Sequence, residues 1–378
     1  MQLTEERDTA ATEALRADRL ARVRASLSER GMEALWVEPS VGLFYLTGWK
    51  PISLERTCGL VVLAADEPRW MLPLLLADER PGPEGEEFVW SDAEGPADAA
   101  RWALAGISRL HVQDSLPAGT LHLLRSLRPD RDIDLDPGVI RDLRERKDHA
   151  EVALLHRSGR ITDDVVGWVG GLDLEGMTER QVATRIQARY LELGLVPTPH
   201  PIVATGAGAA MPHYAGGDVA VRLDAPLLLD FGGLVDGYWS DTTRVYFPAE
   251  VDAEIEDAYG VVCEAYHAAF AVLQPGVPCE EVDRAARSVI ERAGYGDAFL
   301  HRTGHGLGLE VHEAPYLRAG NRQPLQVGHV FSVEPGIYVR DRFGVRYENI
   351  VYLGEDGVEP MNHSPKKHVF SARQGGVE

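Results

Sequence analysis

Apolar residues recur at helical spacing in some segments of the chain and form short continuous runs in others. In residues 13–29, Leu15, Leu20, Val23 and Leu27 fall on one face of a helix. The same kind of spacing predicts further helices at residues 140–169, 178–193, 253–272 and 279–293. Apolar runs typical of strands lie at residues 34–37, 58–64, 202–205, 226–231, 237–247, 329–339 and 344–353. This mixture of strands and helices predicts an α/β or α+β fold.

The length of the chain and one polar segment predict two domains. A chain of 378 residues is longer than a typical single domain. Residues 130–137 form a polar, aspartate-rich connection, and a charged run at residues 141–147 opens the long helix that follows. We therefore expect a smaller N-terminal α/β domain over residues 1–140 and a second domain over residues 141–378.

The composition and charge are those of a folded protein without polyanionic partners. Hydrophobic residues make up 44% of the chain and charged residues 26%, which is ordinary for a globular protein. The formal net charge of −21 would repel nucleic-acid phosphates and anionic lipid headgroups. We therefore expect neither nucleic acid nor a membrane surface as a partner.

Cysteine usage and the N-terminal sequence predict a cytoplasmic protein. Cys58, Cys263 and Cys279 form no CxxC pair, so we expect neither a disulfide framework nor a thiolate zinc site. That pattern fits a reducing compartment. Residues 1–24 carry charges of both signs and lack the apolar core of a signal peptide. No stretch approaches the roughly 18 apolar residues of a membrane helix.

The dipeptide Asp236-Gly237 predicts a β-hairpin. It is a strong signal for a two-residue turn, because glycine accepts the positive φ angle that such turns need. The turn would place Val235 opposite Tyr238, and this pairing fixes the register of both strands.

Two carboxylates fall on one face of the predicted hairpin. Because side chains alternate between faces, Asp230, Gly232 and Asp241 would point the same way, with the two acids as diagonal neighbours and Gly232 leaving room between them. Like charges on a partly buried face need a cation, or one of them must stay protonated. The alternative is an edge hairpin with both acids in solvent, although the apolar run before Asp230 argues for burial.

Three further segments carry an isolated acid or imidazole. His305 lies between two glycines, Glu334 precedes Pro335 at the end of an apolar run, and Glu348 follows Arg346 by two residues in a strand. Each has a simpler explanation by itself. These are a glycine loop with an incidental histidine, a salt bridge to an arginine, and a cross-strand ion pair, respectively.

A glycine-rich segment, TGAGAAMPHY, carries His213. It lacks the spacing of a phosphate-binding loop, so a nucleotide site is not indicated. His213 is either a structural histidine or a proton donor close to the reacting group.

Together and in this order, the segments resemble the pita-bread metallopeptidase family, which contains methionine aminopeptidase, aminopeptidase P and prolidase. The motifs that carry the resemblance are TGAGAAMPHY, the spaced pair Asp230 and Asp241, GHGLGLEVH, SVEPGIY and GVRYENIV. Residues 19–49 resemble the N-terminal domain of prolidases and aminopeptidases P. The resemblance implies a pita-bread catalytic domain preceded by a smaller creatinase-like α/β domain, which would govern substrate access and form dimer contacts.

The resemblance implies a centre with two divalent metal ions. The implied ligands are Asp230, Asp241, His305, Glu334 and Glu348. Asp241 and Glu348 would bridge both ions, and such an oxygen-rich site suits Mn²⁺, with Co²⁺ or Zn²⁺ as alternatives. A hydroxide shared by the ions would attack the scissile carbonyl. Glu334 would transfer the water's proton, and His213 and His312 would flank the substrate.

Within the family, the chain is most similar to prolidase. Methionine aminopeptidases usually lack the N-terminal domain, and Arg346 matches an active-site arginine of prolidase. We therefore expect cleavage of the bond before proline in Xaa-Pro dipeptides, with Arg346 binding substrate or supporting the metal ligands. A dipeptidase also needs a cation for the substrate's carboxylate, for which Arg56 is a candidate; a solvated surface arginine is the alternative. The resemblance further implies a homodimer.

Other functions remain open at this point. An Xaa-Pro aminopeptidase would act on longer peptides with the same residues. A non-catalytic binding protein, a non-peptide hydrolase or a lyase could use the same fold. The complete set of implied ligands argues against a non-catalytic protein.

Overall fold

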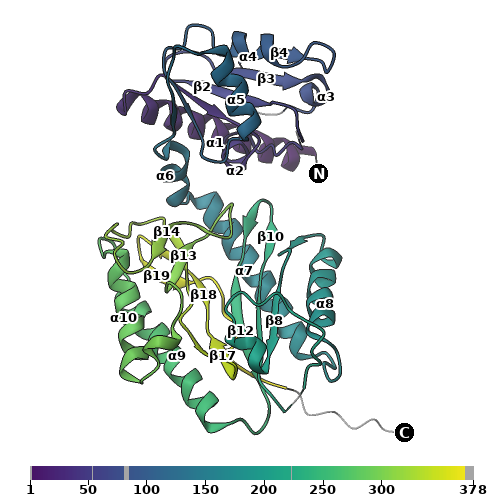
Figure 1. Cartoon of the computed structure of the whole chain (residues 1–378), viewed down its shortest axis with the longest axis vertical. Helices are drawn as coiled ribbons and strands as arrows, with labels where there is room; N and C mark the ends of the chain where they lie inside the picture. Colours follow the sequence, from purple (N-terminus) through teal and green to yellow (C-terminus); the bar gives the residue numbers. More distant parts are fainter. Residues whose placement is uncertain (1, 53, 81–84, 223, 371–378) are drawn as a thin grey trace. The chain divides into compact units, whose positions relative to one another are not determined.

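The computed structural model describes residues 2–52, 54–80, 85–222 and 224–370, with side chains from residue 13 onward. The chain forms two compact units, Met1–Arg144 and Glu145–Glu378 (Figure 1). Each unit has its own sheets and its own core, and each is described separately below. Within the described residues, no helix combines the length and apolar character needed to cross a membrane.

The N-terminal unit is built on one mixed sheet with the strand order β4-β3-β2-β1-β5-β6. Its strands are β1 (Ala34–Val37), β2 (Gly59–Leu63), β3 (Arg69–Pro73), β4 (Glu86–Trp90), β5 (Leu110–Val112) and β6 (Ile133–Leu135). Its helices are α1 (Gln2–Glu29), α2 (Val41–Thr47), α3 (Leu74–Ala77), α4 (Ala97–Ala103), α5 (Ala118–Leu127) and α6 (Val139–Glu145). Buried side chains from β1, β2, β3 and β5 pack against α4 and α5, which explains why these strands are apolar.

The described part of the C-terminal unit contains four sheets, with the orders β20-β12-β9-β8, β14-β13-β15-β18-β19, β11-β10-β7 and β16-β17. The strands of its first half are β7 (Val196–Pro197), β8 (Ile202–Thr205), β9 (Leu227–Phe231), β10 (Gly233–Val235), β11 (Tyr238–Trp239) and β12 (Thr242–Phe247). Those of its second half are β13 (Gly304–Gly306), β14 (Glu313–Leu317), β15 (Val330–Val333), β16 (Gly336–Val339), β17 (Phe343–Arg346), β18 (Asn349–Gly354), β19 (Gly357–Pro360) and β20 (Lys367–Val369).

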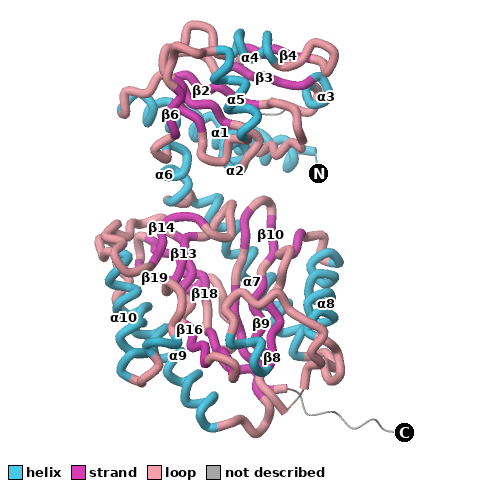
Figure 2. The backbone as a smooth tube through the Cα atoms, viewed as in Figure 1, coloured by secondary structure: helices cyan, strands magenta, loops and turns pink. Residues whose placement is uncertain are grey.

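Four long helices flank these strands. They are α7 (His149–Gly170), α8 (Glu179–Glu192), α9 (Ala253–Ala271) and α10 (Cys279–Arg292), and two short 3₁₀ turns, Gly206–Ala210 and Gly296–Ala298, complete the unit. The strands occupy the middle of the unit, with α8 on one side and α9 and α10 on the other (Figure 2). A capping box opens α8, because Thr178 and Gln181 bond reciprocally.

Strand β9 shows how the apolar pattern positions an acid. Leu227, Leu229 and Phe231 belong to the core formed with α7 and α8, whereas Leu228 belongs to the core formed with α9 and α10. Side chains alternate along a strand, so Asp230 points to the same side as Leu228. Apolar layers cover both faces of this strand, so its residues form a continuous apolar run. Asp230 follows that run and therefore lies in the interior of the unit.

Two expectations about the segment between the units were wrong. Residues 130–137 are more than a connection, because β6 lies within them and pairs in parallel with β5. The single helix expected at residues 140–169 is two helices, α6 and α7. Between them, Lys147 donates its backbone N–H to Gly328, and Asp148 caps α7 in an extended conformation. These contacts with a distant loop override the local helical pattern.

Three long expected strands are each interrupted. The segment 237–247 is divided into β11 and β12, 329–339 into β15 and β16, and 344–353 into β17 and β18. The interruptions fall at Asp241, Glu334 and Glu348. The chain therefore leaves the regular strand at the positions of the candidate metal ligands.

Candidate metal centre

The predicted hairpin is present with the predicted register. Asp236 and Gly237 have φ angles of 48° and 93°, as a two-residue turn of this kind requires. Val235 pairs with Tyr238, and farther along, Asp230 pairs with Thr243. The turn therefore places both halves of the hairpin in the register that brings two acids to the same side.

Asp230 and Asp241 converge as expected, but Gly232 has a different role. A carboxylate oxygen of each acid lies within 4.8 Å of the other and of a Glu348 oxygen. A Cβ at Gly232 would lie 1.8 Å from the Ser240 carbonyl oxygen. The glycine thus permits close approach of the two backbones, rather than leaving space between the carboxylates.

His305 presents a neutral imidazole to these acids. It is buried in β13, and its Nδ1 lies 3.1 Å from the Gly306 carbonyl oxygen. Nδ1 therefore carries the proton, which leaves the lone pair of Nε2 available. That Nε2 lies 3.2 Å from Glu334 and 3.9 Å from Asp241. Burial, followed by the neighbouring His312, holds the pKa of His305 well below its usual value.

The second pair of carboxylates is held by hydroxyl groups. Ser332 donates to Glu334 at 3.2 Å, and Thr243 donates to Oε2 of Glu348 at 2.7 Å. The other oxygen of Glu348, Oε1, is buried and has no hydrogen-bond partner among the residues that the structure describes. A buried carboxylate oxygen without a partner is costly unless a cation occupies the space beside it.

Mutual repulsion among the acids also indicates a cation. Burial, followed by the neighbouring Glu348 and other carboxylates, raises the pKa of Asp241, and burial together with Glu334 raises that of Glu348. Burial raises the pKa of Glu334 to about 7, although Arg346 opposes the shift. Four carboxylates in one buried site cannot all remain ionised without positive charge between them.

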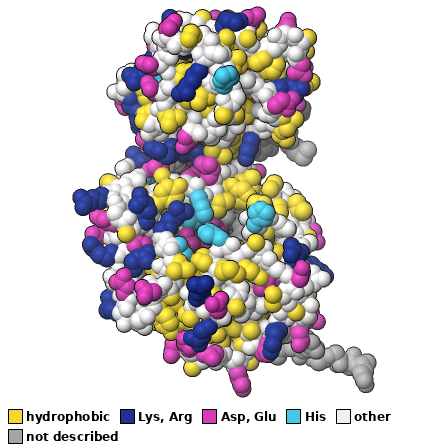
Figure 3. All heavy atoms as spheres, in the orientation of Figure 1, with side chains coloured by type: hydrophobic (Ala, Val, Ile, Leu, Met, Phe, Trp, Pro, Cys, Tyr) yellow, Lys and Arg dark blue, Asp and Glu magenta, His cyan; other side chains and the backbone are white. Residues whose placement is uncertain are grey.

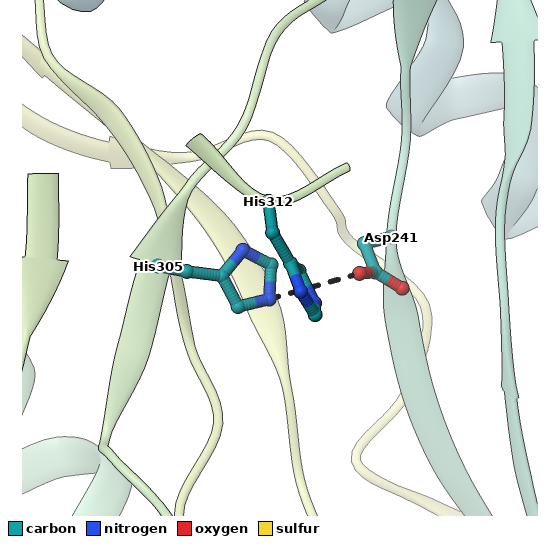
Figure 4. A group of neighbouring side chains, drawn as sticks. All are labelled: Asp241, His305 and His312. Carbon is teal, nitrogen blue, oxygen red and sulfur yellow. Dashed lines mark ion pairs between the residues drawn. The ribbon is translucent and has the colours of Figure 1, made fainter. Parts of the chain in front are cut away.

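Three overlapping groups of side chains have the geometry of metal ligands. In each group one atom from every residue lies within 4.8 Å of the others, and the groups are Asp230–Asp241–Glu348, His305–Glu334–Glu348 and Asp241–His305–His312. Figure 4 shows the third group, in which His312 approaches from a loop beside β13. His312 is thus as near to Asp241 and His305 as a ligand would be, although the sequence suggested only a substrate contact.

These side chains line a cavity of about 460 Å³ in the C-terminal unit. His213 and His312 both lie on its wall, and their contact with a substrate stays a prediction. In the space-filling view, histidine side chains gather at a hollow on this unit (Figure 3). The cavity is large enough for a small peptide.

Comparison with known proteins identifies the family. The model of metallopeptidase family M24 matches residues 153–355, and the creatinase/prolidase N-terminal domain matches residues 19–146. The chain belongs to metallopeptidase family M24.

Relatives of this M24 metallopeptidase match it over almost its whole length. A probable dipeptidase PepE of Mycobacterium tuberculosis is 37% identical, over 92% of this chain and 95% of the relative. The crystal structure of a dipeptidase from Pyrococcus horikoshii has a TM-score of 0.88 at 34% identity, covering 93% of this chain and 99% of the other. That of a recombinant prolidase from Thermococcus sibiricus has a TM-score of 0.89 at 32% identity, covering 93% and 98%. These matches confirm the expected pita-bread fold and creatinase-like N-terminal domain.

The donor set of this M24 metallopeptidase fits divalent metal ions. Four carboxylates and a neutral imidazole form an oxygen-rich, hard site. The unpartnered Oε1 of Glu348 and the repulsion among the acids are both relieved by cations at this position. The buried centre therefore has both the geometry and the electrostatics of a metal site.

The Arg346 side chain already donates hydrogen bonds to three groups of the protein. Its guanidinium donates to Asp230 at 2.5 Å, to the Tyr338 hydroxyl at 2.6 Å and to Thr243 at 2.9 Å. The carboxylate with which Arg346 forms its ion pair is therefore that of Asp230, on β9. Arg346 thus orients metal-centre groups, and direct substrate binding by it stays a prediction.

Arg56 lies in the N-terminal unit, away from the other candidates in the sequence. It forms a bidentate ion pair with Asp92, at 2.9 and 2.7 Å, and also contacts Glu55 at 3.0 Å. Its contribution to substrate binding stays a prediction.

Sequence reasoning missed several residues that line the cavity, notably His200, His301 and Arg302. His301 lies 2.8 Å from the Tyr338 hydroxyl, and burial lowers the pKa of His301 to about 3. Its position just before the motif TGHG was a usable signal. His200 had none, because only the folded chain brings residues 198–202 to the cavity.

Proposed function

We propose that this M24 metallopeptidase is a prolidase, which hydrolyses the peptide bond before proline in Xaa-Pro dipeptides. The observation that carries the proposal is the convergence of four carboxylates and an imidazole in one cavity of dipeptide size. Similarity to proteins described as a dipeptidase and a prolidase supports the substrate class.

The proposed cofactor is a pair of divalent metal ions, best matched by Mn²⁺. The residues that would hold it are Asp230, Asp241, His305, Glu334 and Glu348. When bound, such ions supply a Lewis acid for the scissile carbonyl and lower the pKa of the attacking water. The hard oxygen donors favour Mn²⁺ over a metal that prefers sulfur ligands.

Three side chains would act directly on the substrate. Glu334 would accept the proton of the attacking water and return it to the leaving proline nitrogen, since it lies at the cavity wall among the ligands. His312 would donate a hydrogen bond to the developing oxyanion. His213, which also lines the cavity, would contact the leaving group.

A dipeptide carries a free carboxylate that requires a cation, and Arg302 is the better-placed candidate. Arg302 and Arg346 both line the cavity. The donors of Arg346 are directed to three protein groups, whereas the Arg302 guanidinium stacks 4.6 Å from the centre of the Tyr316 ring. Stacking fixes the plane of the guanidinium and leaves its N–H edge free for a carboxylate. We propose that Arg302 binds the substrate's C-terminal carboxylate.

The proposed function predicts a distinct substrate profile with Mn²⁺. An Ala-Pro dipeptide should be cleaved at least about 100-fold more efficiently than Ala-Pro-Ala, because the tripeptide places its carboxylate beyond Arg302. Steady-state kinetics with both peptides, and with Ala-Ala for the proline preference, measure this. Similar kcat/KM values for the dipeptide and the tripeptide would instead support an Xaa-Pro aminopeptidase.

The same proposal predicts the effect of Arg302→Met. Methionine keeps the apolar contact with Tyr316 but removes the charge, so KM for the dipeptide should rise about 10- to 100-fold with a smaller change in kcat. Arg318→Met, at an exposed arginine of the same unit, is the matched control and should leave both parameters unchanged. A wild-type KM in the Arg302 variant would exclude the proposed contact.

We further propose a homodimer that functions in the cytoplasm. The N-terminal unit exposes Ile52, Leu54, Leu74 and Leu75, each at least 62% accessible. A second chain that covered these side chains would remove their apolar surface from water, which favours association. The three free cysteines fit a reducing compartment. Light scattering of the purified protein would give the mass, and a monomer at micromolar concentration would contradict the dimer.

A further inference from the structure

A buried ion pair lies beneath the loop that carries His312. The ammonium of Lys147 donates to Oε1 of Glu313 at 2.5 Å, and the two side chains are only 1% and 6% exposed. Lys147 lies just before α7, and Glu313 begins β14 immediately after His312. The pair thus joins two segments that are far apart in the sequence.

Stability alone does not explain such a pair. Removing two charges from water is costly, and apolar residues of similar volume often serve the fold as well or better. Breaking one half, by contrast, leaves an uncompensated buried charge. The contacts that the pair makes with its surroundings therefore indicate its role.

The loop between β13 and β14 folds over this pair. The second oxygen of Glu313 accepts the backbone N–H of Glu310 at 3.4 Å. A Cβ at Gly308 would lie 2.6 Å from Glu313 Oε1 and 3.0 Å from the Lys147 Cε, so the loop backbone rests directly on both side chains. The ion pair thus contacts the backbone of the loop formed by residues 307–312 and holds that loop in place.

The first turn of α7, which follows Lys147, also contacts the hairpin that carries Asp241. Glu151 accepts the Tyr238 hydroxyl at 3.0 Å. The next residue, Trp239, donates its backbone N–H to the Gly308 carbonyl oxygen at 2.9 Å. Residues 147–151 therefore support the loop and the hairpin together.

His312 depends on the loop for its position. His312 is an exposed residue at the cavity wall, and the hydrogen bonds found among the described residues include none from its ring. Even so, the ring centre lies 4.0 Å from that of His305. To stay this close to His305 without a hydrogen bond of its own, the His312 ring needs a rigid loop backbone.

We propose that Lys147 and Glu313 are positioning residues, whose buried ion pair fixes the loop so that His312 faces the metal centre. They do not contact the substrate, and they act through the backbone of residues 308–312. The catalytic part of this proposal rests on the proposed function, in which His312 contacts the reacting carbonyl. The structural part concerns the loop alone.

The test compares Lys147→Met, Glu313→Gln and the double variant. Each single variant should lose stability and show kcat reduced about 10- to 100-fold, with bound metal content close to wild type. The double variant removes both charges, so its denaturation midpoint should return toward the wild-type value. Its kcat should remain low, since the loop has lost its fixed support. A double variant with wild-type kcat would overturn the proposal.

A core substitution on the same helix separates positioning from general destabilisation. Val166→Ala, at a fully buried position of α7, should lower stability while leaving kcat of the folded, metal-loaded enzyme unchanged. A comparable loss of kcat in Val166→Ala would show that the effect of the ion pair is only structural.

Hydrogen exchange tests the loop independently of any substrate. In the double variant, amides of residues 308–312 should exchange at least about 10-fold faster than in the wild type, while those of α7 exchange at similar rates. Unchanged exchange in the loop would overturn the proposal. If the wild-type protein did not cleave Xaa-Pro peptides, the proposed function would fail, and the exchange measurement would still decide the role of the pair.

Discussion

At the metal centre, three candidate ligands are each oriented by a neighbour that leaves one atom available. The Gly306 carbonyl fixes the tautomer of His305, and the Thr243 hydroxyl occupies one oxygen of Glu348. Arg346 holds one oxygen of Asp230. Groups oriented in this way reach a cation without reorganisation, which is why such outer contacts affect metal affinity.

The hairpin offers a matched pair of aspartates for testing the ligand assignment. Asp241→Asn should abolish tight metal binding and lower activity by more than about 100-fold, because the variant loses a charged donor shared by two groups of ligands. Metal analysis after gel filtration and Xaa-Pro hydrolysis measure the two effects.

Asp236→Asn is the control for that substitution. Asp236 lies in the same hairpin but at the exposed turn, where it pairs with Arg157 at 2.9 Å. Asparagine also tolerates the positive φ angle there, so metal content and activity should match wild type. Full activity in Asp241→Asn would contradict its assignment as a ligand.

At the scale of elements, close approach of two backbone segments sets the geometry of the centre. Gly232, between β9 and β10, lies against the Ser240 carbonyl, one residue before Asp241. Gly304 similarly faces the Ser332 carbonyl, at 1.9 Å from the position of a Cβ. Glycine at these crossings allows the ligand-bearing strands to approach more closely than side chains would permit.

Gly232→Ala should therefore damage both the hairpin and the metal centre. The added methyl group must displace the Ser240 carbonyl, which should cost about 1–3 kcal/mol of stability and weaken metal binding through Asp241. Urea denaturation and metal titration measure the two effects.

Gly260→Ala provides the contrasting glycine. Gly260 lies on the exposed side of α9, and outside the adjoining backbone of that helix no atom of the described residues lies within 4 Å of an added Cβ. Alanine there should stabilise the protein by about 0.4–1 kcal/mol and leave metal binding unchanged. Equal changes of stability and metal binding in the two variants would contradict the proposed close approach of the backbones at Gly232.

At the scale of the whole molecule, a buried histidine links stability to pH. His329 is 1% exposed, and its Nδ1 accepts the Gln326 N–H at 3.3 Å. Burial, followed by Lys147 and Arg146, lowers the pKa of His329 from 6.5 to about 4. The folded state therefore binds this proton less readily than the unfolded state does.

Linkage fixes the sign of the resulting pH dependence. His329 makes its full contribution to the free energy of unfolding above pH 6.5. That contribution falls as the pH drops toward 4, and the loss amounts to roughly 3 kcal/mol across that range. His329→Asn keeps an acceptor for the Gln326 N–H but cannot bind the proton, so its denaturation midpoint should fall less between pH 6.5 and 4.5. His149→Asn, at an exposed histidine of the same unit, should follow the wild-type curve. Parallel curves for wild type and His329→Asn would contradict the linkage.

Local features could be predicted because their causes lie within a few residues. The turn at Asp236-Gly237, the capping box at Thr178 and the burial of the run before Asp230 each depend on neighbouring backbone and side chains. By contrast, β6 and the break between α6 and α7 depend on partners far away in the sequence, such as the strand β5 and the Gly328 carbonyl. The intrinsic propensity of a segment for helix or strand is too weak to outweigh such contacts.

The sequence by itself determined the α/β character and the hairpin register, because side-chain alternation and turn chemistry depend on neighbouring residues. Only the tertiary structure decided that Arg346 pairs with Asp230, that Arg302 and His301 line the cavity, and that Lys147 supports the loop of His312. These arrangements depend on which surfaces are buried together. Burial is a property of the packed molecule, and no short segment specifies it.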